Sequence, residues 1–337
     1  MKNVLVVGGA GYIGSHTVFE LIENNFSVVV VDDLSTGFEK AIHKDAKFYK
    51  GNIKDEEFLN EIFKREKIDG VIHFAAFSQV GESVLNPLKY YENNVYGTMC
   101  LLKCMIENNV KNIVFSSTAA VYGEPKKVPI EETDEKNPTN CYGETKLAIE
   151  NMLKWFNNAY GLNYVCFRYF NAAGAHKSGL IGEAHSFETH LIPLVLKVAL
   201  KQKDYISIFG TDYNTKDKTA VRDYVHVQDL ATAHIKALEY LINGGKSDVF
   251  NLGSGIPCSV REIIDAAKEV TGLNIPVKEE KRREGDPSIL TASFLKAKKV
   301  LNWEPKHKDI KEIIESAYLW HKNNPEGYLV KAMSINY

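Results

Sequence analysis

Five short apolar runs in the first half of the chain constrain its fold more than any other feature. They cover residues 4–9, 27–34, 70–76, 112–117 and 164–170, and most are rich in Val, Ile or Phe. Segments with helical periodicity separate them. Strands that are apolar on both faces are typical of a parallel sheet covered by helices on both sides. The pattern therefore predicts a doubly wound α/β fold.

After Phe170 the sequence changes to loops with Gly and His, followed by a predicted helix from about 189 to 201. A chain of 337 residues commonly divides into two lobes. We therefore predict a Rossmann domain over residues 1–173 and a smaller α/β substrate domain over 174–337. Parts of the second region around 222–252 are expected to pack back on the first domain.

Charge and composition exclude several classes of protein. Forty-one basic and 43 acidic residues are interspersed and leave a net charge of -2, so no global field favours nucleic acid or an anionic membrane. The chain shows no secretory signal and no run of about 18 apolar residues, and we expect a cytoplasmic protein. Five scattered cysteines do not resemble a disulfide framework. We expect no metal site, because His176, His185 and His190 lack a known ligand spacing.

A glycine-rich turn follows the first apolar run. Gly8, Gly11 and Gly14 precede a helical pattern, which allows a tight turn, close approach of a pyrophosphate and amide donors from the helix start. Such glycines can also serve only as a strand-to-helix turn. Asp32 ends the second run, where an acid accepts hydrogen bonds from an adenosine ribose and repels a 2′-phosphate. Together these features predict NAD rather than NADP.

A tyrosine and a lysine four residues apart are the predicted catalytic pair. Tyr142 and Lys146 open a helical stretch and share one face of it. A phenol pKa of about 10 must fall by about 3 units for base catalysis near neutrality, which requires roughly 4 kcal/mol. A cation at about 4 Å contributes about that much at an effective dielectric of about 20. Ser116, Ser117 and Thr118 end an apolar run and offer a hydroxyl to the reacting oxygen.

The motifs extend along the whole chain. They are GGAGYIGSHT, VIHFAA, VGESVLNPLKYYENNVYGT, SSTAAVYG, YGETK, RYFNAAGAH, VRDYVHVQDL, FNLGSG and REGDPS. With them the chain resembles the UDP-glucose 4-epimerases (UDP-galactose 4-epimerases) of the extended short-chain dehydrogenase/reductase family. The resemblance implies an isomerase of galactose metabolism that holds NAD, takes a UDP-hexose and forms a homodimer through helices around 93–108 and 142–160.

The resemblance also implies the roles of the catalytic residues. Tyr142 would take the proton of the sugar 4-hydroxyl while hydride passes from C4 to NAD, and the 4-keto sugar would receive the hydride on its other face. Thr118 would hydrogen-bond the reacting oxygen. Lys146 would hold the nicotinamide ribose and depress the pKa of Tyr142.

Ligand-binding residues follow from the same resemblance. The implied cofactor residues are Gly8, Gly11, Tyr12, Ile13, Gly14, Asp32, Asp33, Leu34, Ser35, Thr36, Gly37, Asn52, Ile53, Phe74, Ala75, Ala76, Asn93, Ser116, Tyr142, Lys146, Tyr169 and Phe170. The implied substrate residues are Thr118, Tyr142, Asn171, His190, Leu191, Ser207, Phe209, Arg222, Tyr224, Arg283 and Asp286. Asn52, Ser78 and His190 depart from residues common in the family, which are Asp, Lys and Asn respectively.

Three alternatives remain at this point. Nucleotide-sugar dehydratases share the fold but need acids beside the hydroxyl residue, where this chain has Ala119 and Ala120. A non-catalytic NAD-binding protein would be expected to lack Tyr142 or Lys146. The substrate can also be a UDP-N-acetylhexosamine or UDP-pentose, because Leu290 is intermediate between the aromatic residue that restricts N-acetyl sugars and the small residue that admits them.

Overall fold

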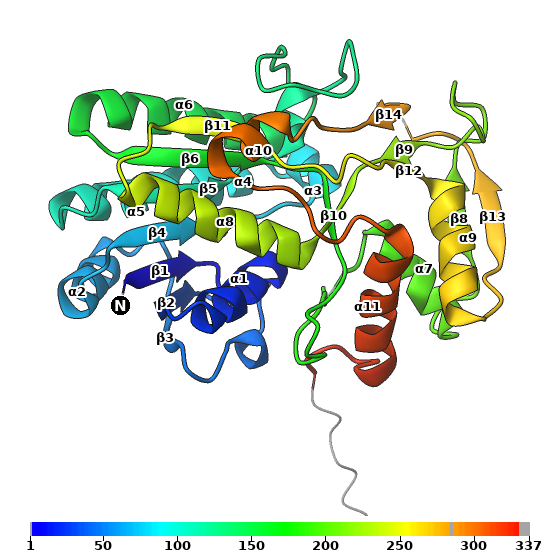
Figure 1. The fold of residues 1–337 in the computed structure, drawn as a ribbon, viewed down its shortest axis with the longest axis horizontal. Coiled ribbons are helices and arrows are strands. Elements are labelled where there is room, and N and C mark those ends of the chain that lie inside the picture. Colours follow the sequence, from blue (N-terminus) through cyan, green and yellow to red (C-terminus); the bar gives the residue numbers. More distant parts are fainter. Residues whose placement is uncertain (1, 186, 284–285, 330–337) are drawn as a thin grey trace, which may run out of the picture.

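A seven-stranded parallel sheet forms the centre of the computed structural model, which describes residues 2–185, 187–283 and 286–329 (Figure 1). Its strands, in spatial order, are β11 (Asp248–Asn251), β6 (Asn163–Arg168), β5 (Asn112–Ser116), β4 (Gly70–His73), β1 (Asn3–Val7), β2 (Ser27–Asp32) and β3 (Lys47–Lys50). Every neighbouring pair is parallel. The doubly wound α/β prediction is confirmed.

The five apolar runs correspond to β1, β2, β4, β5 and β6. The two strands that the runs did not predict are the edge strands β3 and β11. Strand β3 has the sequence KFYK and none of its residues is fully buried, so it lacks an apolar run. Strand β11 has the sequence DVFN, in which only Phe250 and Asn251 are buried. Edge strands carry weaker sequence signals because one side has no neighbouring strand to cover it.

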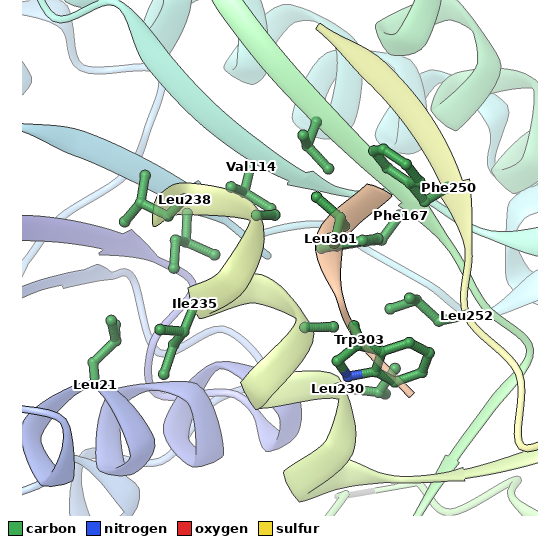
Figure 2. Close-up of a cluster of buried hydrophobic side chains, with 14 of the residues drawn as sticks. Leu21, Val114, Phe167, Leu230, Ile235, Leu238, Phe250, Leu252, Leu301 and Trp303 are labelled. Atoms are coloured by element: carbon green, nitrogen blue, oxygen red, sulfur yellow. The ribbon is translucent and has the colours of Figure 1, made fainter. Parts of the chain in front are cut away.

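Helices cover both faces of the sheet. On one face α1 (Tyr12–Glu23), α8 (Val227–Ile242) and α10 (Leu295–Leu301) contribute to a cluster of buried aliphatic and aromatic side chains. Figure 2 shows Trp303 in this cluster beside Leu230, and its indole Nε1 donates to the Asp229 carbonyl at 3.0 Å. On the other face α2 (Glu56–Glu66), α5 (Gly97–Glu107) and α6 (Cys141–Tyr160) form a second cluster.

A smaller group of elements lies beside the carboxyl edge of the sheet (Figure 1). Helices α7 (Leu191–Ala199), α9 (Val260–Thr271) and α11 (Ile310–Asn323) share a separate buried cluster with β8 (Ile206–Phe209), which pairs in parallel with β13 (Val277–Glu280). Short strands connect the two parts. They are β7 (Asn171–Ala173), β9 (Val221–Arg222), β10 (Tyr224–His226), β12 (Cys258–Ser259) and β14 (Ile289–Leu290).

The chain passes between the two parts more than once. After β10 it returns to the large sheet as α8 and β11, and β11 pairs with β6. It then crosses to α9, and α10 packs again on α8 and β11 before α11 completes the smaller part. The remaining helices are α3 (Val80–Leu85), α4 (Pro87–Tyr90), a π-helical segment (Tyr91–Tyr96) and two 3₁₀ turns (Glu39–Ala41 and Ala119–Tyr122). Within the described ranges, no helix is long and apolar enough to cross a membrane.

Candidate active site

A cavity of about 950 Å³ opens at the carboxyl edge of the sheet. Its lining comes from the loops that follow β1, β2, β4 and β5, from the start of α6, and from residues within 182–185, 187–190 and 286–290 together with Arg283. In open α/β sheets, ligands bind outside the carboxyl ends of the strands. The fold therefore places this cavity where a nucleotide ligand is expected.

The glycine turn forms one wall of the cavity. Gly8 has a φ of +83°, and a Cβ on it would lie 2.5 Å from the Ala75 backbone nitrogen. A Cβ on Gly14 would lie 2.1 Å from the Gly8 carbonyl oxygen. Both glycines are thus required by the turn itself, whose end presents the first amides of α1 to the cavity. This cradle of backbone is consistent with binding of a pyrophosphate.

Asp32 is held at the end of β2 by backbone donors. Its Oδ2 accepts from the Ala10 amide at 2.9 Å and its Oδ1 from the Leu34 amide at 2.8 Å. Burial raises the pKa of this carboxyl, and the two backbone hydrogen bonds lower it in part. Because Asp32 lines the cavity beside the glycine turn, its carboxylate can accept from ribose hydroxyls.

Asn52 makes a contact that an aspartate could not make. Its Nδ2 donates to the Asp33 carboxylate at 2.8 Å, and its Oδ1 accepts from the Lys54 amide at 3.0 Å. An ionised Asp at position 52 would place two carboxylates together and lose the donor. Asn52 thus differs from the Asp common in the family, and Asp33 is a hydrogen-bond partner that suits its amide.

The predicted catalytic pair lies at the start of α6. Asn140 caps this helix by accepting from the Gly143 amide at 2.9 Å, and the Tyr142 amide donates to Ser83 Oγ at 3.1 Å. Lys146 Nζ donates to the Ser116 carbonyl at 2.8 Å and lies 5.8 Å from the centre of the Tyr142 ring. Both side chains line the cavity together with Thr118. The structure thus brings the three predicted catalytic residues together.

The two catalytic side chains have shifted pKa values. Burial raises the pKa of Tyr142 to about 12, and a hydrogen bond from Thr118 opposes this shift. Burial lowers the pKa of Lys146 to about 7, while Cys166 and Glu150 act in the opposite direction. Burial therefore governs the pKa of the Tyr142 phenol. A further positive charge beside the phenol is needed to make it a base near neutrality.

A buried ion pair behind the catalytic residues escaped the sequence analysis. Glu150 accepts from Ser117 Oγ at 2.5 Å and from Arg168 Nε at 2.9 Å. Arg168 also donates to the Tyr122 hydroxyl at 2.8 Å. The network joins α6 to β6 and to the turn after β5. A signal was available, because Glu150 follows Lys146 by four residues and lies on the same face of the helix.

Asn94 is a second missed residue. Its side chain is fully buried, its Oδ1 accepts from the Phe77 amide at 2.9 Å, and its Nδ2 donates to the Phe77 carbonyl at 3.1 Å. The same Nδ2 lies 3.2 Å from Thr145 Oγ1. These bonds fix the loop after β4 against α6. Asn94 has this role only through tertiary contacts, so no local sequence pattern could have indicated it.

Most predicted cofactor residues line the cavity. The exceptions are Leu34, Gly37 and Asn52, which belong to the loops that support it. Gly37 packs against Ala10, where a Cβ would come within 2.8 Å of the backbone carbon. Tyr12 of the glycine turn donates to the Gly174 carbonyl, and burial with the nearby carboxylates Glu183 and Glu188 raises the pKa of its phenol.

The predicted substrate residues divide into two groups. The residues that line the cavity are Thr118, Tyr142, Asn171, His190, Arg222, Arg283 and Asp286, together with Leu290. The residues that do not line it are Leu191, Ser207, Phe209 and Tyr224. Arg222 pairs with Asp286, and the Arg283 guanidinium lies 4.0 Å from the centre of the Phe209 ring. Phe209 thus supports an arginine at the cavity wall. Glu284 and Gly285 of the REGDPS motif lie outside the described residues.

Two further segments of the cavity wall were not among the predicted site residues. Residues 77–82 belong to the loop after β4 and the start of α3, and residues 187–189 precede α7. Ser78, which stands where some family members carry Lys, lies in the first of them. The VGESVLN motif was a signal for the first segment. For the second, the signal was its density of Glu and His.

The fold and the Tyr–Lys pair at its carboxyl edge define an enzyme of the nucleotide-dependent dehydrogenase type. Residues 4–253 match the model of the NAD dependent epimerase/dehydratase family. The chain belongs to this family, and its cofactor is NAD. The glycine cradle, Asp32 and the cavity fit that cofactor.

Relatives match the chain over nearly its whole length. It is 56% identical to a UDP-glucose 4-epimerase of Halalkalibacterium halodurans, covering 96% of this chain and 97% of that protein. It is 55% identical to a UDP-glucose 4-epimerase of Lacticaseibacillus casei, covering 96% and 98%. A crystal structure of a UDP-glucose 4-epimerase superposes with a TM-score of 0.96 at 54% identity, covering 98% of this chain and 100% of that one. The Brucella ovis UDP-glucose 4-epimerase in complex with NAD gives 0.92 at 45% identity, with coverage of 94% and 98%.

Proposed function

We propose that the chain interconverts UDP-glucose and UDP-galactose by inverting C4 of the hexose. The observation that carries the proposal is the meeting of Tyr142, Lys146 and Thr118 in a cavity that also contains the glycine turn and two arginines. Relatives more than 50% identical over nearly the whole chain, which are named UDP-glucose 4-epimerases, support it.

In this proposal each catalytic residue handles one part of the proton chemistry. The glycine turn and Asp32 would hold NAD, which would supply the acceptor and donor of the C4 hydride. Tyr142 Oη takes the proton of the sugar 4-hydroxyl and later gives it back, because it is the phenol in the cavity beside Thr118. Thr118 positions the reacting oxygen. Lys146 contributes positive charge near the phenol and is oriented by the Ser116 carbonyl.

We propose that Arg222, Arg283 and Asp286 bind the UDP part of the substrate. Arg222 and Arg283 offer planar donor groups that suit phosphate oxygens, and Asp286 can accept from ribose hydroxyls once the Arg222 pair rearranges. We also propose the division into a cofactor domain, residues 1–173, and a substrate domain, residues 174–337. Parts of the second domain around 222–252 are proposed to pack back on the first, and the packing of α8 and β11 on the large sheet supports this.

The other activities receive less support. Thr118 is followed in the cavity wall by Ala119 and Ala120, which cannot act as the acid or base that elimination of water requires. Leu290 lines the cavity and is partly buried, so it is the residue through which we expect the sugar range to be set. Replacing Leu290 with Ala should raise turnover of UDP-N-acetylglucosamine relative to UDP-glucose.

A coupled assay tests the proposed reaction. Purified protein is given UDP-galactose without added NAD, and UDP-glucose formation is followed. Turnover under these conditions supports both the reaction and a retained cofactor. Turnover only after NAD is added supports the reaction with a weaker cofactor complex. Absence of turnover in both cases rules out this substrate pair, and N-acetylated and pentose nucleotides are then assayed.

We further propose a homodimer in the cytoplasm. Exposed apolar side chains gather on α3, α4, the π-helical segment, α5 and α6, and they are Leu85, Leu88, Tyr91, Met99 and Trp155. Such an exposed apolar group is typical of a protein interface. The five cysteines are free thiols, which suits a reducing compartment. Light scattering on the purified protein distinguishes a dimer of about twice 37.9 kDa from a monomer.

A further inference from the structure

Four side chains between β7 and α7 point their donor atoms at one another. Glu183, His185, Glu188 and His190 each offer one ligand atom, and all four atoms lie within 4.8 Å of one another. His185 Nδ1 lies 3.2 Å from the Glu188 carboxylate and 3.5 Å from that of Glu183. His190 Nδ1 contacts the Glu183 carboxylate and lies 3.7 Å from that of Glu188.

The burial of the two carboxylates demands positive charge at this place. The Glu183 and Glu188 side chains are only 4% and 3% exposed. Two ionised carboxylates that share a buried site repel each other unless cations compensate them. A single divalent ion neutralises both and leaves the imidazoles neutral, which is the form in which histidine binds metals.

The spacing of most of the donors is close to that of a tetrahedral site. Ligand atoms about 2.1 Å from a tetrahedral metal ion are about 3.4 Å from one another. Three of the four histidine–glutamate separations, 3.2, 3.5 and 3.7 Å, lie near that value, the first to Oε2 of Glu188 and the last to its Oε1. The fourth, between His190 Nδ1 and Glu183 Oε1, is a hydrogen bond of 2.5 Å that would lengthen when an ion enters. Two imidazole nitrogens with two carboxylate oxygens suit zinc, whereas Mg²⁺ and Ca²⁺ prefer oxygen ligands alone.

We propose that Glu183, His185, Glu188 and His190 bind one divalent transition-metal ion of the zinc class. Four protein donors leave no open position, so the ion is structural rather than catalytic. The proposal replaces the expectation of no metal, which weighed His176, His185 and His190 without the two glutamates. His176 lies elsewhere, 3.7 Å from Glu23.

The metal would fix one wall of the cavity. His185, Glu188 and His190 line the cavity, and His190 immediately precedes α7. The Glu183 carbonyl accepts from Trp320 Nε1 of α11 at 3.1 Å, and Glu188 Oε1 accepts from the His190 amide at 2.8 Å. The ion would therefore join this segment to α7 and α11 independently of any substrate.

A second cluster provides a matched control. Glu20, Glu23 and His176 also have ligand atoms within 4.8 Å of one another. This group has only three members, and Glu23 is 41% exposed and already paired with Lys177 at 2.9 Å. We expect it to bind no metal tightly. Glu23→Gln should therefore leave the metal content of the protein unchanged.

Metal analysis of the full-length enzyme tests the proposal. The protein is stripped with EDTA, titrated with ZnCl₂ by calorimetry, and analysed for zinc after dialysis. We expect about one zinc per chain. His185→Ala and Glu188→Gln should each lower the zinc affinity by more than about 100-fold, because loss of a residue that only hydrogen-bonds to a metal ligand lowers it by about 10- to 100-fold. Cobalt(II) substitution should give the visible spectrum of a tetrahedral site in the wild type and in Glu23→Gln only.

Two results would overturn the proposal. One is wild-type protein that retains no zinc and binds it no more tightly than His185→Ala does. The other is cobalt that shows an octahedral spectrum. Retained NAD absorbance and far-UV circular dichroism establish that each variant is folded. Because the readout is metal binding, its failure leaves the proposed epimerase reaction untouched.

Discussion

The two sides of the cavity are built differently. On the sheet side, the side chains of Asp32, Thr118 and Lys146 bond to backbone groups at the carboxyl ends of the strands and in the loops that follow them. On the loop side, the part of the wall at residues 286–290 is held by contacts between side chains, such as the Arg222–Asp286 pair. Backbone partners hold a side chain through the fold itself. Side-chain partners can exchange when a ligand arrives.

This difference suggests a division of labour. Proton transfer needs atoms placed within hydrogen-bond reach in a fixed geometry, which the sheet side supplies. Recognition of the sugar nucleotide needs charged side chains that can change partners. The loop side supplies such side chains. Variants on the sheet side should therefore alter rate or stability, and variants on the loop side should alter binding.

The largest effect is expected from Tyr142→Phe. Loss of the phenol removes the proton acceptor, and general acid–base groups contribute about 10²- to 10⁴-fold. We expect kcat for UDP-galactose to fall by about 1,000-fold while NAD remains bound, measured by its release on denaturation. Tyr205→Phe, at an exposed position outside both the cavity and the proposed dimer surface, serves as the matched control. Retention of more than a tenth of the activity would show that another group takes the proton.

Glu150→Ala should give the next largest effect, on stability. The substitution leaves the buried Arg168 charge without its partner, and breaking a buried pair typically costs about 3–5 kcal/mol. Urea unfolding measures the change. Glu144→Ala, at an exposed position of the same helix, should stay within about 0.5 kcal/mol of the wild type.

Replacing both Glu150 and Arg168 with Met distinguishes the stability cost of losing the ion pair from the cost of leaving one buried charge without a partner. Recovery of at least half of the lost stability is expected, because no charge is then left buried. A double variant as unstable as Glu150→Ala would mean that the hydrogen bonds to Ser117 and Tyr122 matter more than the charges.

Lys146→Met should stabilise the NAD-free protein while abolishing its activity. Burial lowers the pKa of Lys146 to about 7, below its ordinary value. Between about pH 7 and 10.5 the unfolded chain holds a proton that the folded chain has lost, so wild-type stability rises with pH over that range. The gain from Lys146→Met should be greatest below pH 7, shrink by about 1.4 kcal/mol for each pH unit above it, and vanish near pH 10.5.

Urea unfolding at pH 7 and pH 9.5 measures this trend, with Lys154→Met, at an exposed position of the same helix, as the control. A gain in stability that does not shrink between these two pH values would contradict the assignment of a buried, weakly basic lysine. A loss of stability at pH 7 would show that the bond to the Ser116 carbonyl outweighs the cost of burial.

The sequence predicted the sheet side better than the loop side for a physical reason. Gly8, Gly14, Asp32 and the Tyr142–Lys146 pair act at the ends of strands and on one helix turn, so local spacing locates them. Glu183 and Glu188 are recognised as candidate metal ligands only once the fold places His185 and His190 against them. Four residues that match family positions do not line the cavity in this structure, and they are Leu191, Ser207, Phe209 and Tyr224.

Arg283→Ala is expected to have the smallest effect. It tests, on the loop side, the proposed difference between the two sides of the cavity. Arg283 lies at the cavity over Phe209, whereas its neighbour Arg282 pairs with Asp212 outside it. Loss of one phosphate contact should raise KM for UDP-galactose by about tenfold and leave kcat within about twofold, because the contact exists before and during the reaction. Arg282→Ala should change neither value. If Arg283→Ala lowers kcat as much as it raises KM, the loop side also holds the reacting sugar in place, and the proposed separation of chemistry from binding fails.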